Sequence, residues 1–158
     1  MGNLFLVFLL IVSFIIFVID IKKLYIPNTI NIIFLVMAVC YRGFDLYKIE
    51  NGILGAGVYT LPLLFFYGYG SDLAQKEIMG FGDIKLMIGI GYVLGYSDFY
   101  TIYIYYLGTF VIAALFGIVY IVKKKTVRGE IAFSPFLLFS FYCILFMERV
   151  WKIKLFLL

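Results

Sequence analysis

Apolar residues dominate the chain in six long runs, and the short stretches between them hold most of the charged and turn-forming residues. Hydropathy, together with the positions of glycine, proline and charge, places these runs at roughly 4–19, 28–41, 52–69, 84–96, 99–122 and 131–147. A helix needs about 20 residues to cross a bilayer. The pattern therefore predicts an all-α, polytopic membrane protein, a bundle of about six transmembrane helices.

The composition strengthens this prediction. Of the 158 residues, 65% are hydrophobic, whereas soluble domains have about 45–50%. Six spanning helices with short connections use nearly the whole length, so we expect one transmembrane domain over residues 1–158. The first apolar run lacks a basic leading region and a small-residue cleavage site, which indicates a retained helix rather than a signal peptide.

The distribution of lysine and arginine predicts how the bundle is oriented. The first, third and fifth connections hold seven of these residues, including the run "KKK" at 123–125, and the opposite side holds five. Basic loops are retained in the cytoplasm. We therefore expect a multi-pass protein of the cytoplasmic (inner) membrane, with both termini outside and with Asp20 and Asp83 at the same, cytoplasmic face.

Several kinds of chemistry are excluded by the residue types. The chain has no histidine, which removes Ser-His-Asp catalysis and histidine-based zinc sites. Cys40 and Cys143 lie far apart and form no CxxC motif, so we interpret them as packed thiols. No arginine-rich groove with interleaved stacking residues is present, which argues against a nucleic-acid partner. No metal or cofactor is predicted.

Two aspartates remain as the candidate chemistry. Each has an ordinary explanation: Asp20 as a solvated carboxylate beside the lysines that follow it, and Asp83 as a helix N-cap. Together the two aspartates indicate a catalytic role, because two carboxyl groups that share a proton can hydrolyse a peptide without histidine. In "GFGD", Gly80 and Gly82 would let the backbone turn sharply and a substrate strand lie close to the acid.

Three ordered motifs then carry a family resemblance. They are "DIKKLYIPNTIN" starting at Asp20, "GFGD" followed by "IKLM", and the late segment "IAFSPFLLF". Together they resemble the type IV prepilin peptidases, which are membrane aspartyl proteases of the GxGD class, from Asp20 to Phe139. Presenilin-type proteases share the GxGD acid, but their later Pro-Ala-Leu motif is replaced here by "SPF".

The resemblance implies roles for individual residues. Asp20 and Asp83 would be the catalytic pair, and the two glycines of "GFGD" would shape the loop of the second acid. Pro27 would end the first cytoplasmic connection, and Pro135 would kink the last helix near the active site and contribute to substrate binding.

The resemblance also implies a substrate. Such enzymes remove a short basic leader from type IV pilins, pseudopilins or archaellin-like precursors, for pilus assembly or secretion, and Asp72, Glu77 and Glu130 are candidates for attracting that leader. The late motif departs from the family, with Ala132 and Ser134 in place of the usual proline and glycine. Without the CxxC-bearing domain of the long, methylating enzymes, the chain resembles the short, peptidase-only forms.

Two functions of other classes stay open. A small cation- or proton-coupled transporter could use the two aspartates as an ion site, although transporters usually place such acids near the bilayer midplane. A non-catalytic assembly subunit of a pilus or secretion machine would tolerate the loss of either acid.

Overall fold

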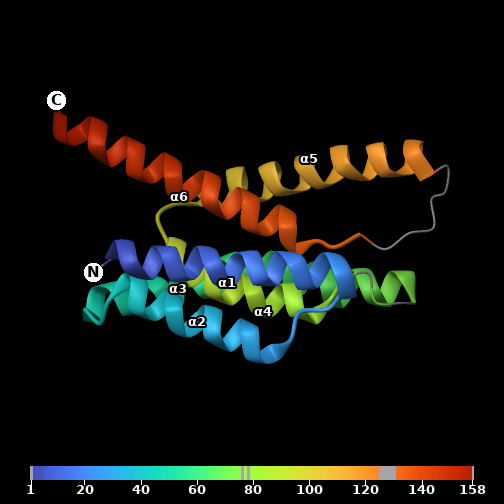
Figure 1. The fold of residues 1–158 in the computed structure, drawn as a ribbon, viewed down its shortest axis with the longest axis horizontal. Helices are drawn as coiled ribbons and strands as arrows, with labels where there is room; N and C mark the ends of the chain where they lie inside the picture. Colours follow the sequence, from blue (N-terminus) through green and yellow to red (C-terminus); the bar gives the residue numbers. More distant parts are fainter. Residues whose placement is uncertain (1, 76, 78, 125–130, 158) are drawn as a thin grey trace.

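The chain forms six helices that run in alternating directions, as a computed structural model shows (Figure 1). The structure describes residues 2–75, 77, 79–124 and 131–157. The helices are α1 (Gly2–Lys23), α2 (Asn28–Arg42), α3 (Leu46–Ala74), α4 (Phe81–Leu94), α5 (Phe99–Lys124) and α6 (Ser134–Leu157). Each predicted apolar run corresponds to one of these helices, and the described residues contain no strand.

The outer surface of the bundle is apolar. Three helical stretches are long and apolar enough to cross a membrane: Leu4–Lys23, Leu46–Ala74 and Phe99–Lys124. Their large apolar side chains are mostly exposed, and Phe14 and Leu115 are examples at 66% and 60%. Such a surface suits lipid rather than water. The predicted helical membrane protein is confirmed.

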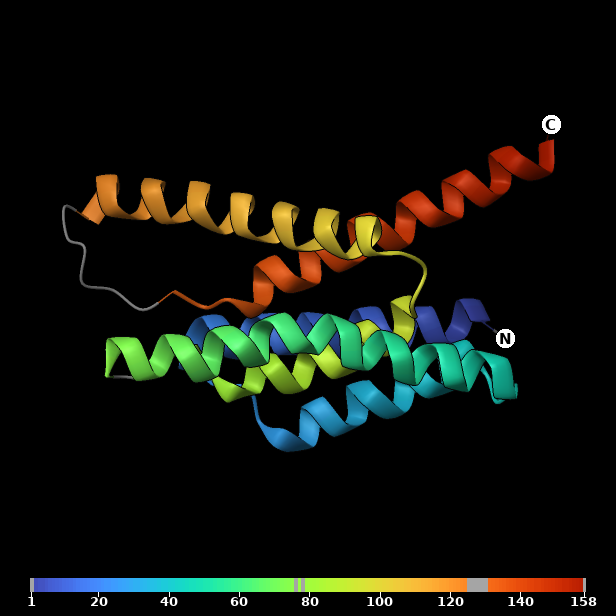
Figure 2. The ribbon, with the colours of Figure 1, turned by 180° about the vertical axis from the view of Figure 1, so that it is seen from behind.

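The short helix α4 is the most enclosed element. It packs against α2, α3 and α6, and Figure 2 shows the long helix α3 lying along it. Glycines make this approach possible, because a Cβ at Gly55 would lie 2.4 Å from the carbonyl oxygen of Gly91. A Cβ at Gly91 would in turn lie 2.6 Å from the carbonyl oxygen of Gly55. Glycine at both positions therefore lets α3 and α4 pack closely.

A polar network closes the C-terminal end of α4. The Arg42 guanidinium donates to the Val93 carbonyl at 2.9 Å and to Asn51 Oδ1 at 2.7 Å. Asn51 Nδ2 donates to the Tyr96 carbonyl at 2.7 Å, and the Tyr96 N–H returns a bond to the Asn51 carbonyl at 3.2 Å. Gly95 turns the chain there with φ +69°. The network joins α2, α3 and the end of α4, so it fixes the position of the helix that carries Asp83.

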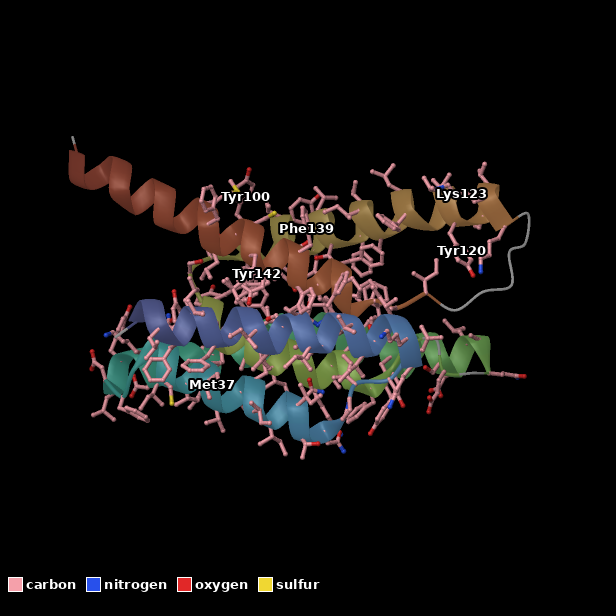
Figure 3. The ribbon with its side chains drawn as sticks, in the orientation of Figure 1. Met37, Tyr100, Tyr120, Lys123, Phe139 and Tyr142 are labelled. Atoms are coloured by element: carbon pink, nitrogen blue, oxygen red, sulfur yellow. The ribbon has the colours of Figure 1, made fainter. Side chains whose placement is uncertain are left out.

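The last two helices are attached through aromatic side chains. Tyr106 of α5 donates to the Tyr59 carbonyl of α3, and the Tyr105 ring meets the Tyr59 ring edge-on at 5.4 Å. Tyr142, labelled in Figure 3 on α6, shares a hydrogen bond of 2.7 Å with Ser13 of α1. These contacts hold α5 against α3 and α6 against α1.

Candidate active site

Alternating helix directions bring three sequence-distant segments to one end of the bundle. Asp20 lies in the last turn of α1, Asp83 in the first turn of α4, and Ser134 is the first residue of α6 (Figure 1). The two aspartates are only 4% and 6% exposed, and their carboxyl groups interact electrostatically. A buried pair of like groups is costly unless the pair binds a proton or a partner.

Asp20 is supported by the N-terminus of α6. Its Oδ2 accepts a hydrogen bond from the backbone N–H of Ser134 at 3.2 Å. The first N–H groups of a helix have no intrahelical partner, and the positive end of the helix dipole lies there. The Asp20 carboxyl group therefore lies where α6 offers a free backbone donor. The alternative of a solvated surface carboxylate is wrong, because the side chain is buried.

Asp83 has a different environment. Gly80 occupies the N-cap position of α4, and Asp83 donates its backbone N–H to the Gly80 carbonyl at 3.1 Å. Its Oδ1 is buried and has no hydrogen-bond partner. The N-cap interpretation of Asp83 is therefore wrong: the residue lies inside the first turn, and its carboxyl group is available for another contact.

Of the two glycines in "GFGD", Gly82 has the more crowded surroundings. Gly80 has φ −70° and ψ 132°, which any residue adopts, so the expected need for glycine in a sharp turn is wrong. A Cβ at Gly80 would lie 3.6 Å from Asp83 Oδ2, and one at Gly82 would lie 3.1 Å from the Cβ of Ile26. Glycine at 82 therefore lets the connection between α1 and α2 pack against the start of α4.

Asn31 was missed by the sequence analysis, although a polar residue in an apolar run was a usable signal. It is 5% exposed, and its Nδ2 donates to the Gly82 carbonyl at 3.1 Å. Its Oδ1 is buried without a hydrogen-bond partner. Asn31 thus ties α2 to the residue that precedes Asp83.

The remaining predicted residues have mixed outcomes. Pro27 is the N-cap of α2 and ends the first connection, as predicted. Pro135 is the second residue of α6, so it starts that helix instead of kinking it, at a position where the missing N–H costs little. Asp72 and Glu77 are exposed at the end of α3 and just beyond it. Glu130 lies outside the described residues.

No metal centre is formed by these side chains. Within the part of the chain that the structure describes, no group of three or more His, Cys, Asp or Glu residues comes together as a metal site would require. Among the described residues, the buried carboxyl groups at this end of the bundle are those of Asp20 and Asp83.

Fold and site together define a helical membrane protein with a buried pair of carboxyl groups at one end. The type IV leader peptidase family matches residues 7–122, and the chain belongs to this family. It is 28% identical over 126 residues to the prepilin leader peptidase/N-methyltransferase of Pectobacterium carotovorum subsp. carotovorum. The match covers 76% of this chain and 43% of that protein, so the chain spans less than half of the relative. No solved structure matches the chain.

Proposed function

We propose that this protein is an aspartic endopeptidase of the GxGD type that removes the leader from prepilin-like precursors at the cytoplasmic face of the membrane. The observation that carries the proposal is the buried pair formed by Asp20 and Asp83 at one end of the bundle. Family membership supports it, because the matched residues 7–122 include both aspartates.

The unequal surroundings of the two acids suggest separate roles. Asp20 accepts an N–H at the start of α6, and a hydrogen bond to the ionised form favours that form. Asp83 has a buried Oδ1 with no donor, where a neutral carboxyl group is cheaper to bury than a charged one. We assign Asp20 as the general base and Asp83 as the protonated acid.

The reaction then balances without another reagent. Asp20 takes a proton from water, the water oxygen attacks the peptide carbonyl carbon, and Asp83 gives its proton to the carbonyl oxygen. The first step leaves a tetrahedral diol at the former carbonyl carbon. In the second step, Asp20 passes its proton to the departing amide nitrogen, while Asp83 regains a proton from one hydroxyl of the diol. The C–N bond breaks, and both acids return to their starting states.

The position of the active site at one face of the membrane would define the substrate class. A scissile bond at the cytoplasmic end of the bundle places a basic leader outside the bilayer and an apolar helix within it. The exposed carboxylates of Asp72 and Glu77, with Glu130, would attract that leader over a distance set by salt screening. A glycine before the cleaved bond lets an extended backbone fit between two neighbouring carboxyl groups.

The test is cleavage of pilin-like precursors by the purified protein in detergent with EDTA present, followed by mass spectrometry of the new amino terminus. We expect one cut, after the glycine that precedes the apolar helix. The rate should fall at low pH, where both acids are protonated, and at high pH, where both are ionised.

Other outcomes would contradict the proposal. A cut within the apolar helix would indicate a presenilin-like specificity. Failure to cut any of several precursors would contradict a peptidase function and favour the ion-site alternative, which proton or cation flux in proteoliposomes would then detect.

A further inference from the structure

A groove lies between α2 and α4 on the outside of the bundle. It encloses about 290 Å³ and is lined by Asn28, Asn31, Ile32, Leu35, Lys85 and Ile88. On α2 the lining residues follow helical spacing, and on α4 they are three positions apart. The polar residues gather toward the beginnings of both helices, and the aliphatic residues continue from there toward the middle.

This groove is separate from the carboxyl pair. Successive residues of a helix are about 100° apart, so Asp83 and Lys85 point to nearly opposite sides of α4. Asp83 is buried toward Asp20, whereas Ile32 and Ile88 of the groove are 60% and 37% exposed. The groove opens to the surroundings of the bundle.

The polar end of the groove offers a cation without an anionic partner. Lys85 Nζ donates to Asn28 Oδ1 at 2.8 Å and lies 5.0 Å from the centre of the Phe81 ring. Both partners are neutral, and among the described residues no carboxylate pairs with this lysine. A half-buried cation with neutral partners attracts an anion.

The same end contains an acceptor without a donor. Asn31 is 5% exposed and uses its Nδ2 to hold the Gly82 carbonyl, while its buried Oδ1 has no hydrogen-bond partner. A buried acceptor that makes no hydrogen bond is unfavourable, and a ligand that donates to it removes this cost. A ligand that fits the groove would therefore combine an anion, a hydrogen-bond donor and an aliphatic tail.

We propose that the groove binds an anionic glycerophospholipid with a hydroxyl-bearing headgroup, of the phosphatidylglycerol type. Its phosphate would lie at Lys85, a headgroup hydroxyl would donate to Asn31, and an acyl chain would cover Ile32, Leu35 and Ile88. Lipid phosphates lie at the ends of membrane helices, which is where this polar end is found. A basic leader peptide is a poor occupant, because Lys85 would repel it.

The experiment measures lipid retention by the purified full chain. Protein in detergent is mixed with equal amounts of phosphatidylglycerol and phosphatidylcholine, and bound lipid is counted by native mass spectrometry. We expect preferential retention of phosphatidylglycerol, about fivefold weaker in Lys85→Gln, since one interfacial cation is worth about 1 kcal/mol. The matched control is Lys22→Gln, an exposed cation at the same end that does not line the groove.

A second variant tests the aliphatic part. Ile32→Trp should fill the groove and lower retention while leaving Lys85 in place. Thermal melting checks that each variant is folded. Equal retention in wild type, Lys85→Gln and Ile32→Trp would overturn the proposal, as would displacement of the lipid by glycerol phosphate, which has no acyl chain. Peptide cleavage does not enter this measurement, so the lipid site and the peptidase function can fail independently.

Discussion

The two ends of α4 differ in how their buried polar side chains are hydrogen-bonded. At the C-terminal end, Arg42 and Asn51 bond to each other and to the backbone of Val93 and Tyr96. Helix-terminal carbonyls that would lack partners are thereby satisfied. These hydrogen bonds join α2, α3 and the end of α4, so we expect them to stabilise the fold.

At the N-terminal end, three buried polar atoms lack a hydrogen-bond partner. They are Asn31 Oδ1, Asp83 Oδ1 and Ser134 Oγ. Each such atom costs about 1–3 kcal/mol, and the cost is recovered only when a water molecule, a substrate or another ligand supplies the missing bond. We infer from this comparison that the N-terminal end of α4 is the functional one, and four substitutions test this inference.

The largest effect is expected from the carboxyl pair. Asp20→Asn and Asp83→Asn should each lower the cleavage rate by about 10²–10⁴-fold or more, because each removes one partner of the proton transfer. Stability should not fall, because asparagine has nearly the size of aspartate and a neutral amide is cheaper to bury than a carboxylate. Initial rates on a prepilin-like precursor and thermal melting in detergent measure the two effects. Substantial activity in either variant would rule out the aspartyl mechanism.

A substitution at the C-terminal end of α4 should change the stability of the protein but not its activity. Arg42→Met should lower the free energy of unfolding by about 2–3 kcal/mol, because it leaves the Val93 carbonyl and Asn51 Oδ1 without their charged donor. The cleavage rate per folded molecule should stay near that of the wild type. Denaturant titration in micelles measures the first quantity. Lys48→Met, at an exposed lysine of α3, is the control and should change neither.

If Arg42→Met lowered the rate while leaving the unfolding free energy unchanged, the assignment of this end to stability would be wrong. The same result in Lys48→Met would instead show that the assay responds to surface charge in general.

The smallest effect is expected at the start of α6. Ser134→Ala removes a fully buried hydroxyl that has no partner, but keeps the backbone N–H that binds Asp20. Stability should change little, and the rate should drop about three- to tenfold if the hydroxyl bonds water or substrate during the reaction.

Ser140→Ala is the matched control for this change. Its hydroxyl is also buried without a partner, but it lies six residues further along α6, away from the two acids. Equal rates for wild type, Ser134→Ala and Ser140→Ala would show that an unpartnered hydroxyl at the N-terminal end has no catalytic importance.

Much of the architecture could be predicted from local sequence properties. The six apolar runs and their breakers predict the six helices, and Pro27 predicts the start of α2. Alternating helix directions then place Asp20 and Asp83 at one end. Gly55 and Gly91 have no side chain, and this permits the close contact of α3 and α4. The length of an apolar run, the absence of a side chain at glycine and the fixed φ of proline are properties of one residue or a few neighbouring residues. They can therefore be recognised in the sequence.

The contacts of each side chain were decided by the tertiary structure. Pro135 was expected to kink a helix that it in fact starts, since the apolar run extends before it and hides the boundary. Three hydrogen bonds show this: Ser134 N–H to Asp20, Asn31 to Gly82, and Arg42 to Val93. They join residues that are 51 to 114 positions apart. They depend on how the helices rotate and pack against each other.

What the sequence determined by itself was the class of structure and the choice of two aspartates as candidates. A chain this apolar retains few ionisable groups, and its helix ends are marked by local residues. What only the tertiary structure decided was the difference between those acids. The carboxyl group of Asp20 accepts a hydrogen bond from the N-terminus of α6, whereas Asp83 Oδ1 has no hydrogen-bond partner. Hydrogen bonding and desolvation are set by the neighbours that packing brings within a few ångströms, and no local pattern encodes those neighbours.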